Sequence, residues 1–257
     1  MTDRLKKIGK RFYDNFWINH QTLTCDEKCR LQFVLSNAKT AINHGTDTAI
    51  ADIGCGRGWL TKALSNFGKV TGFDQSTVEA ARRYPRLCFV ECDVLDMREA
   101  ECFDLVVCSE VIEHIRRKDQ PRLLLSISKI LRSDGTLILT TPNHPVATAA
   151  VEKLGLWHEL QPVENWLDAV ALRKLLTPHF DVQKLTTLMF FPMNLRKIGP
   201  LSRIYRLFYE QCGGYYFLDS LLRPTFKGLY LAVIARKKSG TLKKIDQKGG
   251  EIRWEYQ

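Results

Sequence analysis

The sequence predicts an α/β fold in which a mostly parallel sheet is covered by helices on both faces. Short apolar runs alternate with segments of helical periodicity from residue 48 onward. The apolar runs also lack the polar–apolar alternation of a strand with one solvated face, which is typical of buried parallel strands. The 257 residues fit one such domain with added segments, and a hydrophobic fraction of 45% is enough for a sizeable core.

Seven short segments rich in apolar residues are expected to form strands. They are residues 48–54, 69–74, 87–93, 103–110, 136–142, 180–190 and 228–237. Helical periodicity predicts helices before and between them. These are residues 4–19, 26–43, 58–68, 76–84, 119–135 and 168–177.

Several helix ends carry residue signals of their own. Gly68 is expected to cap the end of helix 58–68, and Gly135 follows the end of helix 119–135. Ser76 is expected as the N-cap of helix 76–84, with Glu79 in the capping-box position. Pro121 falls in the first turn of its helix, where a missing N–H is tolerated.

We expect a single domain over residues 1–238 with two added segments. Residues 1–45 form an N-terminal helical cap, and residues 192–226 form an insertion that mixes arginines with aromatic residues. Residues 239–257 are interpreted as a basic polar tail.

The net charge of +10 is concentrated in three segments. Residues 1–11, 196–227 and 236–257 each carry +4, which leaves −2 for the rest of the chain. Such basic patches suit an acidic ligand, nucleic acid or an anionic lipid surface, or they are solvated segments that aid solubility.

The sequence also indicates in which cellular compartment the protein is expected. The apolar runs are shorter than the roughly 20 residues of a membrane span, and the first residues lack the apolar core of a secretory signal. We therefore expect a cytoplasmic protein, with peripheral contact at the inner membrane face as an alternative. The eight cysteines form no C-x-x-C pair and are expected to be reduced thiols rather than a zinc site.

A glycine-rich turn follows the first expected strand, in the sequence DIGCGRGW. Glycines at 54, 56 and 58 allow the backbone to approach a ligand closely, with Asp52 just before them. The dinucleotide fingerprint requires a small third residue where Trp59 stands. The turn therefore argues against a dinucleotide and for another ligand.

The next two strands end in carboxylates, Asp74 and Asp93. A carboxylate at the first of these positions can accept hydrogen bonds from both hydroxyls of a ribose. A group at the second can meet an adenine edge. The three strand ends together indicate a nucleoside-containing ligand.

This combination resembles the class I S-adenosylmethionine-dependent methyltransferases. The matching segments are IADIGCGRG (50–58), VTGFD (70–74), ECDV (91–94), FDLVVCSEVIEHI (103–115) and GTLILTTPN (135–143).

The resemblance implies a Rossmann-like, doubly wound sheet of seven strands with the last one antiparallel. It also implies S-adenosylmethionine as cofactor and S-adenosylhomocysteine as product. Asp52 and the glycine turn would hold the methionine end, Asp74 the ribose, and Asp93 with Val94 the adenine. The full set of expected cofactor-binding residues is Asp52, Gly54, Cys55, Gly56, Gly58, Asp74, Gln75, Asp93, Val94 and Ser109.

The stretch SEVIEHI places Glu110, Glu113 and His114 at the end of the fourth strand, beside the topological switch point. If a helical turn begins at 110, the three side chains project from one side. A neutral His114, oriented by either glutamate, could remove a proton from an acceptor hydroxyl. Two alternatives stay open. Glu110 and His114 could be purely structural, or the three could hold a divalent cation.

The metal alternative comes from a further resemblance. The pattern E-x-x-E-H is similar to that of the small-RNA 2′-O-methyltransferases and of the ubiquinone-pathway O-methyltransferases, where it binds a metal. Their additional ligand resembles His158 of this chain.

The expected function is O-methylation of a small molecule or of a saccharide- or lipid-linked acceptor. The alternatives are an RNA 2′-O-methyltransferase with a divalent metal and, from another class, a non-catalytic S-adenosylmethionine-binding subunit. Tyr13, Phe16 and Trp17 are expected to pack the N-terminal helix or to form a lid over the cofactor. The insertion at 192–226 could roof an acceptor pocket, lie at a membrane interface or only pack on the core.

Overall fold

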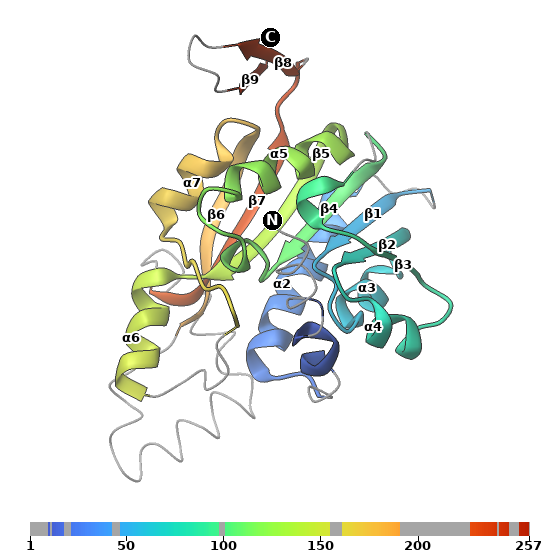
Figure 1. Cartoon of the computed structure of the whole chain (residues 1–257), viewed down its shortest axis with the longest axis vertical. Helices are drawn as coiled ribbons and strands as arrows, with labels where there is room; N and C mark the ends of the chain where they lie inside the picture. Colours follow the sequence, from blue (N-terminus) through green and yellow to red (C-terminus); the bar gives the residue numbers. More distant parts are fainter. Residues whose placement is uncertain are drawn as a thin grey trace.

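A computed structural model gives the architecture of the chain (Figure 1). It describes residues 10, 12–17, 22–42, 47–97, 101–154, 161–190, 227–240, 242–246 and 252–256. His158, the insertion at 192–226 and part of the N-terminal cap lie outside the described residues. In the described part of the chain, no helix has both the length and the hydropathy that a membrane span requires.

All seven expected strands are present and form one sheet, in the order β3-β2-β1-β4-β5-β7-β6. The five strands from β1 to β5 run parallel, whereas β7 runs antiparallel to both of its neighbours. The chain order reverses between β1 and β4, so the switch point lies there. The strands are β1 (Ala49–Ile53), β2 (Lys69–Asp74), β3 (Cys88–Glu91), β4 (Phe103–Ser109), β5 (Leu131–Pro142), β6 (Phe180–Phe190) and β7 (Gly228–Lys237).

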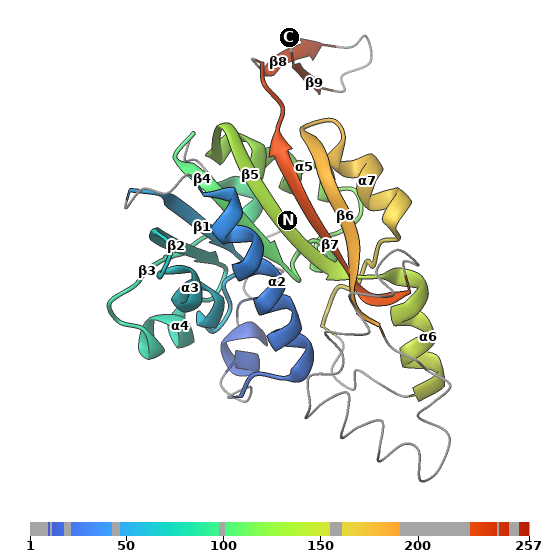
Figure 2. The same cartoon turned by 180° about the vertical axis from the view of Figure 1, so that it is seen from behind.

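Helices cover both faces of this sheet, as expected (Figures 1 and 2). Helices α2 and α3 lie on one face, and α5 and α7 lie on the other. The described helices are α2 (Cys25–Ala41), α3 (Trp59–Leu64), α4 (Val78–Arg83), α5 (Gln120–Ile130), α6 (His144–Leu154) and α7 (Ala169–Leu176).

Strand β4 shows why the central strands read as continuous apolar runs. Its residues from Leu105 to Cys108 are all fully buried. Leu105 and Val107 pack into the cluster beneath α2, while Val106 and Cys108 pack into the cluster beneath α5 and α7. Because successive side chains of a strand point to opposite faces, a strand covered on both sides needs apolar residues at every position.

Two of the expected helix signals are wrong. Helix α3 ends at Leu64, and Gly68 instead allows close approach to β1, since a Cβ there would lie 2.3 Å from the Thr48 carbonyl oxygen. Helix α4 begins at Val78 and has no capping box. The Ser76 hydroxyl donates to Asp14 instead.

The expected boundary between helix 119–135 and strand 136–142 is also wrong. Helix α5 ends at Ile130, and β5 begins at Leu131, which pairs with Phe103. The register then shifts, with Asp134 in the left-handed region at φ 62°. Gly135 therefore belongs to an irregular stretch of β5, where a Cβ would lie 2.8 Å from a side-chain atom of Leu131.

One helix and one hairpin have no counterpart in the sequence prediction. Helix α6 follows directly after β5, beginning at His144. Within the segment interpreted as a basic polar tail, β8 (Leu242–Asp246) and β9 (Ile252–Tyr256) pair as an antiparallel hairpin.

Candidate functional site

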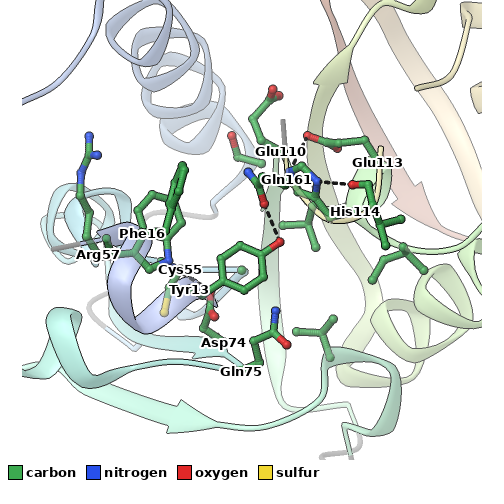
Figure 3. Close-up of a pocket in the computed structure, with 18 of the residues that line it drawn as sticks. Tyr13, Phe16, Cys55, Arg57, Asp74, Gln75, Glu110, Glu113, His114 and Gln161 are labelled. Carbon is green, nitrogen blue, oxygen red and sulfur yellow. Dashed lines mark hydrogen bonds and ion pairs between the residues drawn. The ribbon is translucent and has the colours of Figure 1, made fainter. Parts of the chain in front are cut away.

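A cavity of about 1120 Å³ opens at the carboxyl ends of the parallel strands. Its lining brings together the glycine turn after β1, the ends of β2 and β3, the SEVIEHI segment after β4, and the N-terminal residues 13–17. In Figure 3 the ring of Tyr13 lies between Asp74 and Gln75 on one side and Glu110 and His114 on the other. The cavity therefore has two ends with different chemistry.

The glycine turn forms one wall, and its backbone requires glycine. Gly54 and Gly56 have φ values of 71° and 50°, in the left-handed region. A Cβ on Gly54 would lie 2.2 Å from the Val111 side chain. The N–H groups of Gly54 and Cys55 donate to the Phe73 carbonyl, which holds the turn against β2.

Gly58 differs from the other two glycines because it lies outside the cavity lining. It is the N-cap of α3 with φ 79°, and a Cβ there would meet the side chains of Ala80, Tyr84 and Phe89. Gly58 therefore has a packing role between α3, α4 and β3, and its contact with a cofactor stays a prediction.

Asp74 organises the glycine turn from the end of β2. Its carboxylate accepts hydrogen bonds from the N–H of Gly56 at 2.9 Å and of Ser76 at 3.0 Å. Burial raises the pKa of Asp74 to about 6, and these backbone hydrogen bonds partly oppose that rise. The carboxylate thus fixes the turn and borders the cavity at the same time.

Asp52 is almost fully buried at the end of β1. It accepts a 2.6 Å hydrogen bond from the Thr61 hydroxyl of α3. Burial raises its pKa to about 7, and the Asp74 charge adds to the rise. Asp52 therefore ties β1 to α3 while also lining the cavity.

The remaining residues expected at the cofactor also line the cavity. Asp93 is the N-cap of the 3-10 turn η1 (Val94–Asp96), where it accepts from the Leu95 N–H at 3.1 Å. Ser109, at the end of β4, shares a 2.8 Å hydrogen bond with the Thr140 hydroxyl. The expected residues in the lining are Asp52, Gly54, Cys55, Gly56, Asp74, Gln75, Asp93, Val94, Ser109, Glu110, Glu113 and His114.

Glu110 stands in a strained conformation just after β4, with φ 58°. Its N–H donates to the Thr140 carbonyl, and its carboxylate accepts from the Thr140 hydroxyl at 3.0 Å. Burial raises the pKa of this carboxyl to about 8, although the nearby Arg30 guanidinium opposes the rise. Its side chain keeps 20% of its surface exposed, so a ligand in the cavity would change this environment.

Glu113 is 1% exposed and accepts a 2.9 Å hydrogen bond from the Thr141 hydroxyl. Burial raises its pKa to about 8. Thr140 and Thr141 are neighbours on β5, and successive strand side chains point to opposite faces. Glu110 and Glu113 are therefore held on opposite sides of β5.

This arrangement corrects the expectation that three ionisable groups project from one side of a helical turn. The 3-10 turn η2 (Ile112–His114) begins two residues after Glu110. Across the described part of the chain, no three His, Cys, Asp or Glu side chains form a group that could hold a metal ion. His158, the additional ligand in the metal reading, is not among those residues.

His114 lines the cavity and is fixed through one ring nitrogen. Its Nδ1 lies 2.9 Å from the Val163 carbonyl oxygen. A carbonyl can only accept, so Nδ1 carries the proton of the neutral ring and Nε2 has a free lone pair. Nε2 is 3.7 Å from a Glu113 carboxylate oxygen.

Sequence reasoning missed a buried polar network on α2 and β7 that also lines the cavity. Arg30 pairs with Asp26 at 2.9 Å, and its guanidinium lies 4.4 Å from the centre of the Tyr230 ring. The Tyr230 hydroxyl donates to Asp26 at 2.9 Å. Asp26 and Arg30 have the i, i+4 spacing of a surface ion pair, so the sequence alone does not distinguish this network from a solvated helix face.

Two buried N–H donors at the cavity wall have no hydrogen-bond partner among the described residues. They are Nε of Arg30 and Nε1 of Trp17. Buried donors are normally satisfied, so each is suited to an acceptor atom of a bound molecule.

The N-terminal residues lie over the glycine turn. A Cβ on Gly56 would lie 2.7 Å from the Trp17 ring, and Asp14 accepts a hydrogen bond from Ser76. The Tyr13 hydroxyl donates to Gln161 at 2.5 Å, which links this segment to the far side of the cavity (Figure 3). Tyr13, Phe16 and Trp17 all line the cavity, an arrangement that favours the lid interpretation.

Comparison with known proteins agrees with this geometry. Residues 51–139 match the model of a methyltransferase domain family. The ubiquinone biosynthesis O-methyltransferase of Rickettsia canadensis is 26% identical over 152 residues, covering 55% of this chain and 62% of that protein. The mitochondrial enzyme of the same name from Rattus norvegicus is 32% identical over 135 residues, covering 44% and 38%. The chain thus spans less than two thirds of the length of each of these relatives.

Solved structures share the fold at low sequence identity. The N-methyltransferase NodS of Bradyrhizobium japonicum, in complex with S-adenosylhomocysteine, has a TM-score of 0.61 at 16% identity, covering 90% of this chain and 99% of NodS. A chain of the Haloferax volcanii complex with the Trm112 methyltransferase activator has a TM-score of 0.63 at 15% identity, covering 91% and 100%. The [4+2]-cyclase SpnF has a TM-score of 0.54 at 16% identity, covering 81% of each chain. Residues 51–139 thus match a methyltransferase domain family, and the sheet built around them has the fold of the class I, S-adenosylmethionine-dependent methyltransferases.

Proposed function

We propose that this chain binds S-adenosylmethionine and methylates a hydroxyl group of a small molecule or of a saccharide- or lipid-linked acceptor. The observation that carries the proposal is one continuous cavity. It joins the glycine turn and Asp74 at one end to a tautomerically fixed histidine, His114, at the other.

The residues of the cavity suit this cofactor. Gly54 and Gly56 present a wall that any Cβ would fill, as a closely approached ligand requires. The Nε of Arg30 makes no hydrogen bond to the described residues, although it lies 3.9 Å from the Glu110 carboxylate, and it is a donor for a carboxylate such as that of the methionine end. Asp74 is an acceptor for ribose hydroxyls, and Asp93 with Val94 borders the position expected for the adenine.

When bound, the cofactor supplies a methyl group on a positively charged sulfur. The chain's own task is then to align the acceptor and to remove its proton. Nε2 of His114 has the free lone pair, so it would accept a hydrogen bond from the acceptor hydroxyl and then its proton. The Glu113 carboxylate, 3.7 Å from Nε2, would stabilise the charged ring when it is ionised.

Aromatic side chains favour a flat or ring-containing acceptor. Tyr13, Trp166 and Tyr230 line the cavity together with Pro142 and Pro162. The ubiquinone biosynthesis O-methyltransferases, with which this chain shares part of its sequence, add support for a hydroxyl acceptor. The RNA alternative gains no such support, because acidic residues outnumber basic ones in the described lining, which is therefore not the basic and aromatic stripe of an RNA-binding surface.

A non-catalytic role is the alternative from another class. SpnF, a [4+2]-cyclase, shows that this fold serves more than one chemistry, so fold alone does not establish methyl transfer. The fixed tautomer of His114 favours catalysis, since a binding subunit would not require a histidine with its lone pair at the cavity.

Calorimetry with S-adenosylhomocysteine and turnover with radiolabelled S-adenosylmethionine test the proposal. We expect micromolar binding of the first and methylation of at least one member of a panel of catechols, phenols and glycosides. Turnover that is unchanged by EDTA would support His114 as a general base over the alternative of a bound divalent cation. Absence of S-adenosylhomocysteine binding would refute both the enzyme and the binding-subunit proposals.

A further inference from the structure

The loop of residues 161–166 is bound closely to the segment that carries His114. The Asn165 N–H donates to the Glu113 carbonyl at 2.7 Å, and its side-chain amide donates to the Ile115 carbonyl at 3.1 Å. Gln120 of α5 donates to the carbonyls of both Ile112 and Asn165, at 3.0 and 3.3 Å. The position of η2 is therefore set by this loop as well as by β4.

Glu164 determines the shape of the loop from within. One of its carboxylate oxygens accepts from the Gln161 N–H at 3.1 Å, and the other accepts from the Trp166 indole N–H at 2.7 Å. The two donors stand on either side of Glu164 in sequence, so the carboxylate closes the turn between them. Val163 lies inside that turn, and its carbonyl is the acceptor for Nδ1 of His114 at 2.9 Å.

The Glu164 carboxylate also lies close to the imidazole. Its Oε1 is 3.7 Å from Nδ1 of His114, on the side of the ring away from Nε2. Each carboxylate oxygen already accepts from a loop donor. The carboxylate thus faces the ring in an orientation that the loop itself fixes.

We infer that Glu164 is a positioning residue for His114. It holds Val163 where the carbonyl keeps the proton on Nδ1, and this leaves the Nε2 lone pair at the cavity. The inference rests on the proposed function, in which Nε2 receives the acceptor's proton. It assigns a role to a residue outside the E-x-x-E-H pattern, reached only through the folded loop.

The test uses the full-length protein saturated with S-adenosylhomocysteine and labelled with ¹⁵N-histidine. Long-range ¹H–¹⁵N NMR distinguishes a ring protonated at Nδ1 from one protonated at Nε2, and H114Q identifies the His114 signals. We expect the Nδ1–H form in the wild type. In E164Q one of the two loop N–H donors would face the amide NH₂ group, which cannot accept a hydrogen bond. The turn would then no longer hold the Val163 carbonyl at Nδ1, so we expect the Nε2–H form of His114 to appear.

Turnover supplies the second measurement, with catechol as the acceptor probe or with the best acceptor of the panel. We expect E164Q to lower kcat about tenfold, as for other residues that orient a catalytic group. The KM for S-adenosylmethionine should stay within about twofold, because the hydrogen bonds of Glu164 run to Gln161 and Trp166, and its close approach is to His114, rather than to the glycine turn. E164D keeps both acceptor oxygens, and we expect it to recover part of the loss.

D168N is the matched control. Asp168 lies four residues further on, caps α7 by accepting from the Ala171 N–H at 2.7 Å, and lies outside the cavity lining. Asparagine also caps helices well, so D168N removes the same charge with little structural cost. We expect it to leave the His114 tautomer and kcat unchanged.

A wild-type tautomer and kcat in E164Q would overturn the inference. So would a kcat loss matched by an equal loss of S-adenosylhomocysteine affinity or by a large fall in Tm, which would mark a merely structural role. Failure of the proposed function has a different signature. Wild-type turnover in H114Q would show that His114 is not the general base. The NMR result would still decide whether Glu164 sets the tautomer of His114.

Discussion

The two ends of the cavity are built in different ways. The glycine-turn end consists of residues at successive strand ends, and its key hydrogen bonds run from backbone N–H groups to Asp74. The His114 end is assembled from α2, η2, the loop 161–166 and β7, and its contacts join side chains from distant segments. A backbone cradle follows from the fold itself, whereas a side-chain assembly depends on every segment that contributes to it.

Removing the imidazole should have the largest effect, and it should act on one end alone. We expect H114Q to reduce turnover by about 10² to 10⁴-fold, the range for loss of a general base. S-adenosylhomocysteine affinity, measured by calorimetry, should change less than about twofold. Parallel loss of turnover and affinity would show that the two ends are not separable.

Removing the Asp74 carboxylate should have the opposite pattern. The carboxylate accepts two backbone hydrogen bonds and is the proposed acceptor for the ribose. Hydrogen bonds to a charged group contribute about 1.5–3 kcal/mol each, so D74A should weaken S-adenosylhomocysteine binding at least about 100-fold. D74N keeps one acceptor oxygen and should bind better than D74A. Unchanged affinity in D74A would contradict the assignment to the ribose.

The pH dependence of stability compares the two ends through their buried carboxyls. Burial raises the pKa of Asp74 to about 6, of Asp52 to about 7, and of Glu110 and Glu113 to about 8. A carboxyl whose pKa is higher in the folded protein than in the unfolded chain favours folding fully below the unfolded value, near 4. That contribution is lost as the pH rises through the folded value.

The unliganded protein should therefore lose stability between about pH 5 and pH 8, and its Tm should fall by several degrees. Calorimetric scans at constant ionic strength measure this. The double variant E110Q/E113Q should flatten the upper part of the fall, and D74N should flatten the lower part. A Tm that stays constant over this range would show that these carboxyls ionise as freely in the folded protein as in the unfolded chain.

The hydrogen bond between Tyr13 and Gln161 joins the two ends, and its removal should have the smallest effect. A neutral hydrogen bond contributes about 0.5–1.5 kcal/mol, so Y13F should weaken S-adenosylhomocysteine binding by about two- to tenfold. Stopped-flow dissociation should show the change mainly in the off-rate. F12Y, on the same helical segment but outside the cavity lining, provides a control that should bind like the wild type.

The sequence was sufficient for the sheet and for most of the glycine-turn end, and the reason is locality. DIGCGRG and the carboxylate of Asp74 each lie at a strand end, where parallel strands bring consecutive signals to one edge. The pattern does not distinguish a ligand-facing glycine from one required by packing, and Gly58 is in close contact with the Phe89 side chain.

The other end could be predicted only in part. Glu110, Glu113 and His114 are adjacent in sequence, but their separation onto two sides of β5 depends on Thr140 and Thr141. Tyr230 and Asp26 are 204 residues apart, and no local signal joins them. Helix ends were predicted poorly for a similar reason, since Ser76 bonds to Asp14 rather than to its own helix.

The antiparallel placement of β7 has a consequence for how such a domain can be altered. The chain leaves the sheet after Phe190 and returns at Gly228, which pair with each other, and Tyr230 pairs with Pro142 at the cavity edge. The entropy of closing a loop between two fixed points grows only slowly with its length. Segments of different size and chemistry can therefore be grafted between these two residues without redesign of the sheet or the glycine turn.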